Sequence, residues 1–136
     1  MHVQRHFKPT RNRRGVLSME LLLTLPILGV LLMGLFEFSL LFFAQGDIAE
    51  ACRAGARRAA VQGATVEDVE AEVVNHLSPR LQQCVHVDAD CGEHPGDVVA
   101  VAVKAPMGAA APDMLWCIGF SLQGQNFQCE SRMRKE

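Results

Sequence analysis

Residues 21–44 read LLLTLPILGVLLMGLFEFSLLFFA, and in this run of 24 residues only Thr24, Glu37 and Ser39 carry polar side-chain groups. As an α-helix the run would be about 36 Å long, because each residue adds about 1.5 Å. A hydrocarbon core is about 30 Å thick, so a helix of this length can span it. A removable signal peptide is the alternative, but its apolar region usually has only about 7–15 residues and ends in small residues at a cleavage site. The run therefore predicts a retained membrane anchor.

The charges on either side of this run predict how it crosses the membrane. Residues 1–15 contain five basic side chains and no acidic one: Arg5, Lys8, Arg11, Arg13 and Arg14. Basic flanks stay in the cytoplasm, so we expect the N-terminus inside and the chain after residue 44 outside. The rest of the chain has eight basic and fifteen acidic side chains. A nucleic-acid-binding protein carries its basic charge on the folded part, so that class is excluded.

Two glutamates lie in or next to the apolar run. Glu20 stands directly before it, where an acidic side chain also suits the first turn of a helix. Glu37 lies about two-thirds of the way along. A carboxylate at membrane depth costs a few kcal/mol, so it usually reaches water or pairs inside a protein assembly. Both interpretations of Glu37 stay open from the sequence.

The junction before the run, residues 13–21, reads RRGVLSMEL. A basic leader, a glycine, four residues and a glutamate that opens an apolar helix resemble a type IV prepilin-peptidase site. The resemblance implies cleavage between Gly15 and Val16 on the cytoplasmic side, so that Glu20 becomes the fifth residue of the mature chain. The Glu20 carboxylate would then be compensated by the α-ammonium of a neighbouring subunit's first residue.

Further segments extend the resemblance to the N-terminal half of TadE-like proteins, which are minor pilins or pseudopilins of tight-adherence (Flp-type) pilus systems. The matching segments are Leu25-Pro26, Phe36-Glu37-Phe38, the stretch ACRAGARRAA at 51–60 and the closing SRMRKE at 131–136. Major Flp pilins usually carry Tyr after the glutamate, whereas Leu21 stands there in this chain. That difference favours a minor component over the main filament subunit.

The resemblance implies a structural component of a pilus assembly or secretion apparatus, and no enzyme or cofactor. Its expected partners are other pilin-like subunits, the assembly machinery, a prepilin peptidase and membrane lipid. Its expected place is the bacterial inner membrane, as a single-pass protein, with Glu20 and Glu37 serving assembly. The alternative is an unprocessed single-span membrane protein whose outward domain binds a partner.

The remaining sequence predicts an α+β fold in three parts: a basic leader (1–15), a transmembrane helix extended outward (16–62), and a small extracytoplasmic domain (63–136). Residues 45–62 continue the helix with a stripe of mostly small side chains: Ile48, Cys52, Gly55 and Ala59. This stripe packs either against another subunit or against the chain's own domain. Thr65 and Asp68 predict a capping box that opens a second helix. Alternating apolar residues then predict about three antiparallel strands, at 85–90, 97–105 and 126–133.

Four of the five cysteines follow the anchor, on the side of a membrane where thiols oxidise: Cys84, Cys91, Cys117 and Cys129. Four cysteines allow three pairings. We favour Cys84–Cys91 and Cys117–Cys129, because each pair brackets a turn-like stretch. Cys52 is then the odd one, either a packing residue or an intermolecular link, and packing is favoured.

Metal binding and catalysis are the competing interpretations of the same region. The pattern Cys84-x-His86-x4-Cys91-x2-His94 offers zinc ligands, but its spacing repeats no known zinc knuckle, so we expect no metal. A Cys/His hydrolase would need a third, orienting residue and an oxyanion loop, and the sequence shows neither. An enzyme is therefore not expected.

Overall fold

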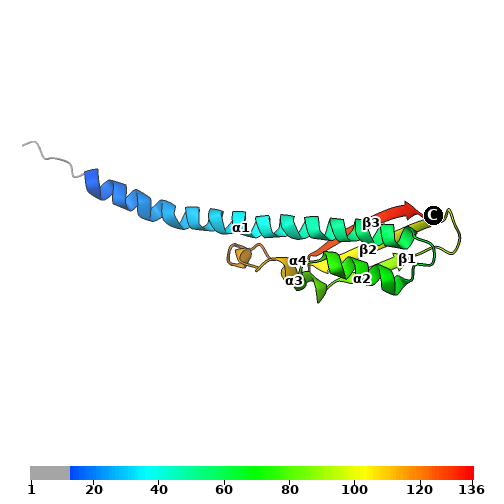
Figure 1. The fold of residues 1–136 in the computed structure, drawn as a ribbon. Coiled ribbons are helices and arrows are strands. Elements are labelled where there is room, and N and C mark those ends of the chain that lie inside the picture. Colours follow the sequence, from blue (N-terminus) through cyan, green and yellow to red (C-terminus); the bar gives the residue numbers. More distant parts are fainter. Residues whose placement is uncertain (1–12) are drawn as a thin grey trace, which may run out of the picture. The chain divides into compact units, whose positions relative to one another are not determined.

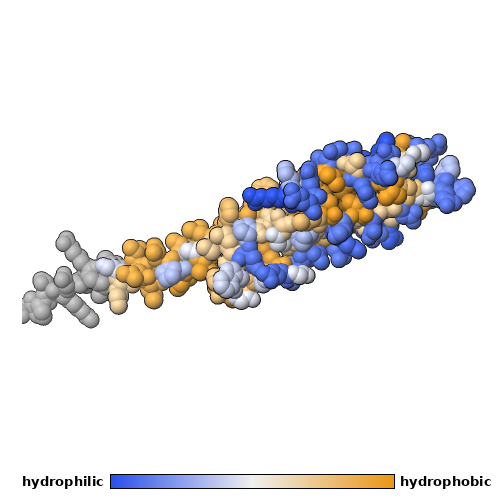
Figure 2. Space-filling view, turned by 90° about the horizontal axis from the view of Figure 1, so that it is seen from below, coloured by the Kyte–Doolittle hydropathy of each residue, from blue (hydrophilic) through white to orange (hydrophobic). Residues whose placement is uncertain are grey.

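The computed structural model describes residues 13–136, with side chains described from Ser18 onward. The longest element is the helix α1, Arg13–Ala60, with Pro26 inside it (Figure 1). The chain divides into two compact units, Met1–Leu32 and Met33–Glu136. In the first unit, α1 exposes its apolar side chains. Figure 2 shows hydrophobic residues along this N-terminal part of the helix.

The second unit is an α+β domain, which confirms the predicted fold class. After α1 come two further helices, α2 (Val66–His76) and α3 (Pro79–Gln82), and then the strands β1 (His86–Asp90) and β2 (Val98–Pro106). The short helix α4 (Met107–Ala110), the 3-10 helix η1 (Leu115–Ile118) and the strand β3 (Asn126–Arg134) complete it. The predicted second helix and the three strands are present within a residue or two of their expected ends.

The sheet is antiparallel, with β2 in the centre and the order β1-β2-β3. His86 pairs with Lys104 on one side, and Val98 pairs with Arg134 on the other. Because side chains alternate along a strand, Val99, Val101 and Val103 all point to one face, where they are fully buried. Lys104 on the opposite face is exposed. The sheet is thus covered on one face only.

The covering layer consists of α2 and of the part of α1 that belongs to the same unit (Figure 1). Val69 and Val73 of α2 join Ile48 and Ala56 of α1 in one core cluster with the β2 valines. Thr65 caps α2 as predicted: its Oγ1 accepts a hydrogen bond from the Asp68 N–H, and Asp68 Oδ2 accepts one from the Thr65 N–H. A small domain therefore closes around the C-terminal half of the long helix.

Candidate functional site

The N-terminal part of α1 carries the residues on which a membrane and assembly function would depend. The helix from Ser18 to Ala60 contains an 18-residue window with mean hydropathy 2.3, so it is long and apolar enough to cross a membrane. Its large apolar side chains are exposed, with Leu22 at 74% and Phe43 at 74%. Such a surface is unfavourable in water and suits lipid.

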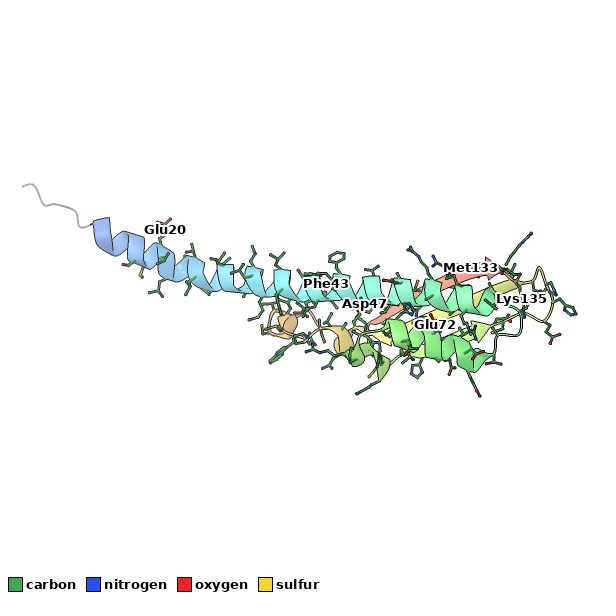
Figure 3. All side chains as sticks on the ribbon, viewed as in Figure 1. Glu20, Phe43, Asp47, Glu72, Met133 and Lys135 are labelled. Carbon is green, nitrogen blue, oxygen red and sulfur yellow. The ribbon has the colours of Figure 1, made fainter. Side chains whose placement is uncertain are left out.

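The expected processing site lies at the start of this helix. Gly15 and Val16 lie in the first turns of α1, and their side-chain surroundings are outside the described residues. Glu20 is exposed on the helix surface, and Figure 3 shows its side chain projecting from α1. Within the described residues, no hydrogen bond or ion pair holds this carboxylate. Its position on the outside of an apolar helix leaves it accessible to a partner.

Glu37 has quite different surroundings. It is 1% exposed, in a helix whose neighbouring side chains Phe36 and Phe38 are exposed. Its Oε2 accepts hydrogen bonds from two successive backbone N–H groups, that of Met114 at 3.2 Å and that of Leu115 at 3.1 Å. Its Oε1 is buried and has no hydrogen-bond partner among the described residues. The carboxylate therefore reaches neither water nor lipid and instead fastens a loop of its own domain to α1.

That loop, residues 112–122, closes on itself through a second carboxylate. Asp113 Oδ2 accepts a hydrogen bond from the Ser121 hydroxyl at 2.9 Å, and Asp113 Oδ1 accepts one from the Leu122 N–H at 3.3 Å. The Phe120 ring lies against Phe38 of α1, with the ring centroids 6.0 Å apart. The local sequence around Glu37 gives no sign of its contact with this loop, because nearly eighty positions separate the carboxylate from the amides it binds.

The stripe of small residues on α1 packs inside the chain's own domain. Ile48, Cys52 and Ala59 are at most 2% exposed. At Gly55 an added Cβ would stand 2.6 Å from Val73 Cγ2 of α2 and 3.3 Å from Val101 Cγ1 of β2. The intramolecular interpretation of the stripe is thus the one the structure supports. Cys52 packs here as expected, with its Sγ 3.2 Å from the Val101 carbonyl oxygen.

All five cysteines are free thiols, and neither favoured disulfide fits this fold. Cys84 and Cys91 stand before and after β1, an extended strand of five residues. An extended strand advances about 3.3 Å per residue, which separates the first and last residues of β1 by about 13 Å. A disulfide needs Cα atoms within about 7 Å. The pairing of Cys84 with Cys91 was expected from a turn, and a strand occupies that place.

Cys117 and Cys129 lie beside different parts of α1. Cys117 lies in η1, next to the Leu115 amide that binds Glu37, whereas the Cys129 carbonyl oxygen lies 3.4 Å from Cys52 Sγ. Glu37 and Cys52 are fifteen residues apart on one helix, which is about 22 Å. The two cysteines therefore lie at different levels of the domain, too far apart for a disulfide.

The metal interpretation is not supported either. In the part of the chain that the structure describes, no group of three or more His, Cys, Asp or Glu side chains is placed to hold a metal ion. Cys84, His86, Cys91 and His94 do not gather, because they are spread along β1 and the loop after it. In that loop, Asp97 Oδ2 accepts hydrogen bonds from the N–H groups of His94 and Glu93, which lower the pKa of its carboxyl group. These contacts shape a turn and do not form a cation site.

Comparisons with known proteins bear on the N-terminal segment alone. No curated protein and no solved structure matches the chain. A family model described as TadE-like protein matches residues 15–57, which is less than half of the chain. The matched segment begins at the expected cleavage glycine, includes Glu20, Glu37 and the whole apolar run, and ends in the small-residue stripe. Residues 15–57 of this chain are therefore similar to the TadE-like family, in agreement with the resemblance read from the sequence.

Proposed function

We propose that this protein is a structural, minor pilin-like component of a tight-adherence pilus assembly or secretion apparatus. The observation that carries the proposal is the family match, which falls on a helix long and apolar enough to anchor the chain in a membrane. The basic side chains before the helix favour a cytoplasmic N-terminus and an extracytoplasmic domain in the bacterial inner membrane.

The proposal assigns different roles to the two glutamates. Glu20 is exposed on an apolar helix surface, which suits a contact with the α-ammonium of a neighbouring pilin-like subunit. Glu37 serves assembly indirectly, by holding the loop 112–122 in place beside α1. Gly15 and Val16 form the bond that a prepilin peptidase would cut before the subunit joins its partners.

Processing gives the decisive test. We expect the protein extracted from membranes that contain the cognate prepilin peptidase to begin at Val16, and the protein from cells without the peptidase to keep residues 1–15. Intact-mass measurement separates the two chains. A Gly15→Leu variant should stay unprocessed, because a bulky side chain would replace the glycine that precedes the cleaved bond. Leu22→Ala, which changes a side chain of the same helix within two turns of the cleavage site, should be cut as the wild type is.

An unprocessed wild-type chain in the presence of the peptidase would contradict the pilin function. It would favour an uncleaved single-span protein whose outward domain binds a partner.

A further inference from the structure

We propose that the loop 112–122 is a second membrane contact, which inserts into the outer leaflet of the bilayer that α1 spans. The lipid-facing side chains are Trp116, Ile118 and Phe120, which are 70%, 58% and 44% exposed. This inference rests on the proposed anchoring of α1, and it adds a lipid-binding surface on the folded domain itself. Tryptophan is the side chain most typical of membrane–water interfaces, because its ring is apolar and its N–H is polar.

The charges around the loop fit contact with lipid. Residues 107–127 contain one charged side chain, Asp113, and α1 contains one between Glu20 and Asp47, namely Glu37. Both carboxylates accept hydrogen bonds from the loop: Glu37 from the Met114 and Leu115 amides, and Asp113 from Ser121 and Leu122. Glu37 is therefore buried, and the half-buried Asp113 is compensated by hydrogen bonds within the loop, while the apolar side chains are exposed.

The length of the membrane span places the loop at the correct level. A hydrocarbon core needs about 20 helical residues. Counted from Val16, directly after the basic residues, the span ends near Leu35, and counted from residue 21 it ends near Leu40. The loop packs on this stretch: a Cβ at Gly34 would stand 3.7 Å from Leu115 Cδ1, and Phe120 contacts Phe38. With either count the loop lies at the outer end of the span.

An apolar groove adjoins the same surface. It has a volume of about 330 Å³ and lies between α1 and the segments that flank the loop. Its lining residues are mainly aromatic and aliphatic: Phe38, Leu41, Phe42, Met107, Phe120, Leu122 and Phe127, with Gln45 and Gln125. Phe42, which is 72% exposed on α1, lines the groove, so acyl chains of lipid beside this face of α1 can fill it.

Trp116 is the only tryptophan of the chain, which allows a direct test with the unaltered protein. The full chain is reconstituted in phosphatidylcholine–phosphatidylglycerol vesicles whose lipids carry bromine near the top of the acyl chains. We expect blue-shifted Trp116 emission, loss of emission in the brominated vesicles, and protection from aqueous iodide. Quenching by iodide without quenching by bromine would overturn the inference. Protection from both quenchers would also overturn it, because a protein neighbour would then cover the loop.

Two double variants move the single tryptophan to another position. One reports on the anchoring of α1, and the other reports on the rest of the domain. Trp116→Phe with Leu28→Trp places the tryptophan near the middle of the apolar run, and its quenching by lipids brominated near the ends of the acyl chains reports that α1 is inserted. Trp116→Phe with Val98→Trp places it at the start of β2, where we expect quenching by iodide only. If Leu28→Trp is quenched by bromine and native Trp116 is not, the loop contact is wrong and the anchor stands. If Leu28→Trp is not quenched, both the membrane insertion of α1 and the membrane contact of the loop are wrong.

A charge substitution tests whether the same surface binds lipid. Ile118 and Val98 are equally exposed, at 58% and 59%. Ile118→Asp should shift Trp116 emission to the red and restore iodide quenching, because a carboxylate pulls the loop out of the apolar phase. Val98→Asp, the matched control at the start of β2, should leave both signals unchanged. An Ile118→Asp chain with wild-type emission would overturn the inference.

Discussion

At the scale of single residues, Glu37 shows how one buried carboxylate fixes a loop to a helix. A carboxylate in an apolar run is unfavourable unless its oxygens are compensated. Here two backbone N–H groups compensate Oε2, whereas Oε1 is left without a partner among the described residues. The Leu115 amide, at the start of η1, in return gains an acceptor that the helix does not supply, while the Met114 amide donates both to Glu37 and to the Pro112 carbonyl oxygen.

We therefore predict that Glu37→Ala destabilises the domain by about 1–3 kcal/mol, because the Leu115 amide loses its buried acceptor, whereas the Met114 amide keeps its hydrogen bond to the Pro112 carbonyl oxygen. Glu37→Gln keeps an oxygen for these amides and should stay close to the wild type. Denaturant titration in detergent micelles, followed by Trp116 emission, measures the change. Ser39→Ala is the control on the same helix, because its hydroxyl bonds only to the Leu35 carbonyl oxygen and is exposed. An unchanged free energy of unfolding for Glu37→Ala would contradict the role given to the carboxylate.

Gly55 shows a second single-residue requirement, namely close approach of α1 to α2 and β2. An added methyl group would stand 2.6 Å from Val73 Cγ2, and the branched valine side chain has little freedom to move away. At Gly46 of the same helix nothing lies within 4 Å of an added Cβ. The two glycines therefore differ in surroundings and share the same helix.

Comparison of Gly55→Ala with Gly46→Ala should isolate this steric effect. Both substitutions gain helix propensity, worth about 1 kcal/mol. Only Gly55→Ala overpacks the core, which typically costs about 1–3 kcal/mol. We expect Gly46→Ala to raise the midpoint of thermal unfolding and Gly55→Ala to lie below it by that difference. Equal midpoints would show that α1 does not pack as closely as the structure indicates.

At the scale of elements, the start of α2 is held by its capping box and by an ion pair with α1. Asp68 Oδ2 accepts the Thr65 N–H and lies 3.3 Å from the Arg58 guanidinium. The Thr65 backbone hydrogen bond, followed by those of the Thr65 side chain and Arg58, lowers the pKa of the Asp68 carboxyl group below its ordinary value. A lowered pKa means that the folded state prefers the ionised form.

The sign of the pH dependence follows from this shift. The contribution of Asp68 is fully present above its ordinary pKa, near pH 4, and is lost as the pH falls through its lowered folded value. We predict that the stability difference between wild type and Asp68→Asn is constant at neutral pH and shrinks below about pH 4. Thermal unfolding monitored by circular dichroism at several pH values measures it. Glu70→Gln removes the same charge from the same helix and serves as the control for the loss of one carboxylate.

At the scale of the whole molecule, the two parts of the long helix α1 have different surroundings. Its C-terminal half is covered by its own domain, and its N-terminal part exposes apolar side chains together with Glu20. A protein that only anchors itself has no use for a carboxylate at that place, whereas a subunit in a helix bundle can pair it with a neighbour's α-ammonium.

We predict that Glu20→Ala leaves membrane insertion and cleavage after Gly15 intact but abolishes pilus output and co-purification with other pilin-like subunits. Removing one partner of a buried ion pair commonly costs about 3–5 kcal/mol, because the other charge stays buried and unpaired. Surface pilin yield and affinity co-purification measure the effect. Leu22→Ala, an exposed neighbour on the same helix, serves as the control. Wild-type assembly by Glu20→Ala would show that assembly does not need the Glu20 carboxylate.

The sequence by itself determined the features that arise from local pattern. The apolar run at 21–44 requires a long helix, Thr65 and Asp68 mark the start of α2, and the alternation of valines gives the central strand. The N-terminal residues also carry enough pattern to indicate the TadE-like family, which the family match at residues 15–57 confirms. Each of these signals depends on residues that lie close together in the sequence.

Only the tertiary structure decided what depends on distant parts of the chain. The Glu37 carboxylate could not be matched to the Met114 and Leu115 amides, because local sequence does not encode which loop returns to which turn of a helix. The cysteine pairings failed for the same reason: whether Cys84 and Cys91 meet depends on β1 pairing with β2, and a paired strand keeps its ends apart. Backbone pairing and core packing set those distances, and both are properties of the folded chain.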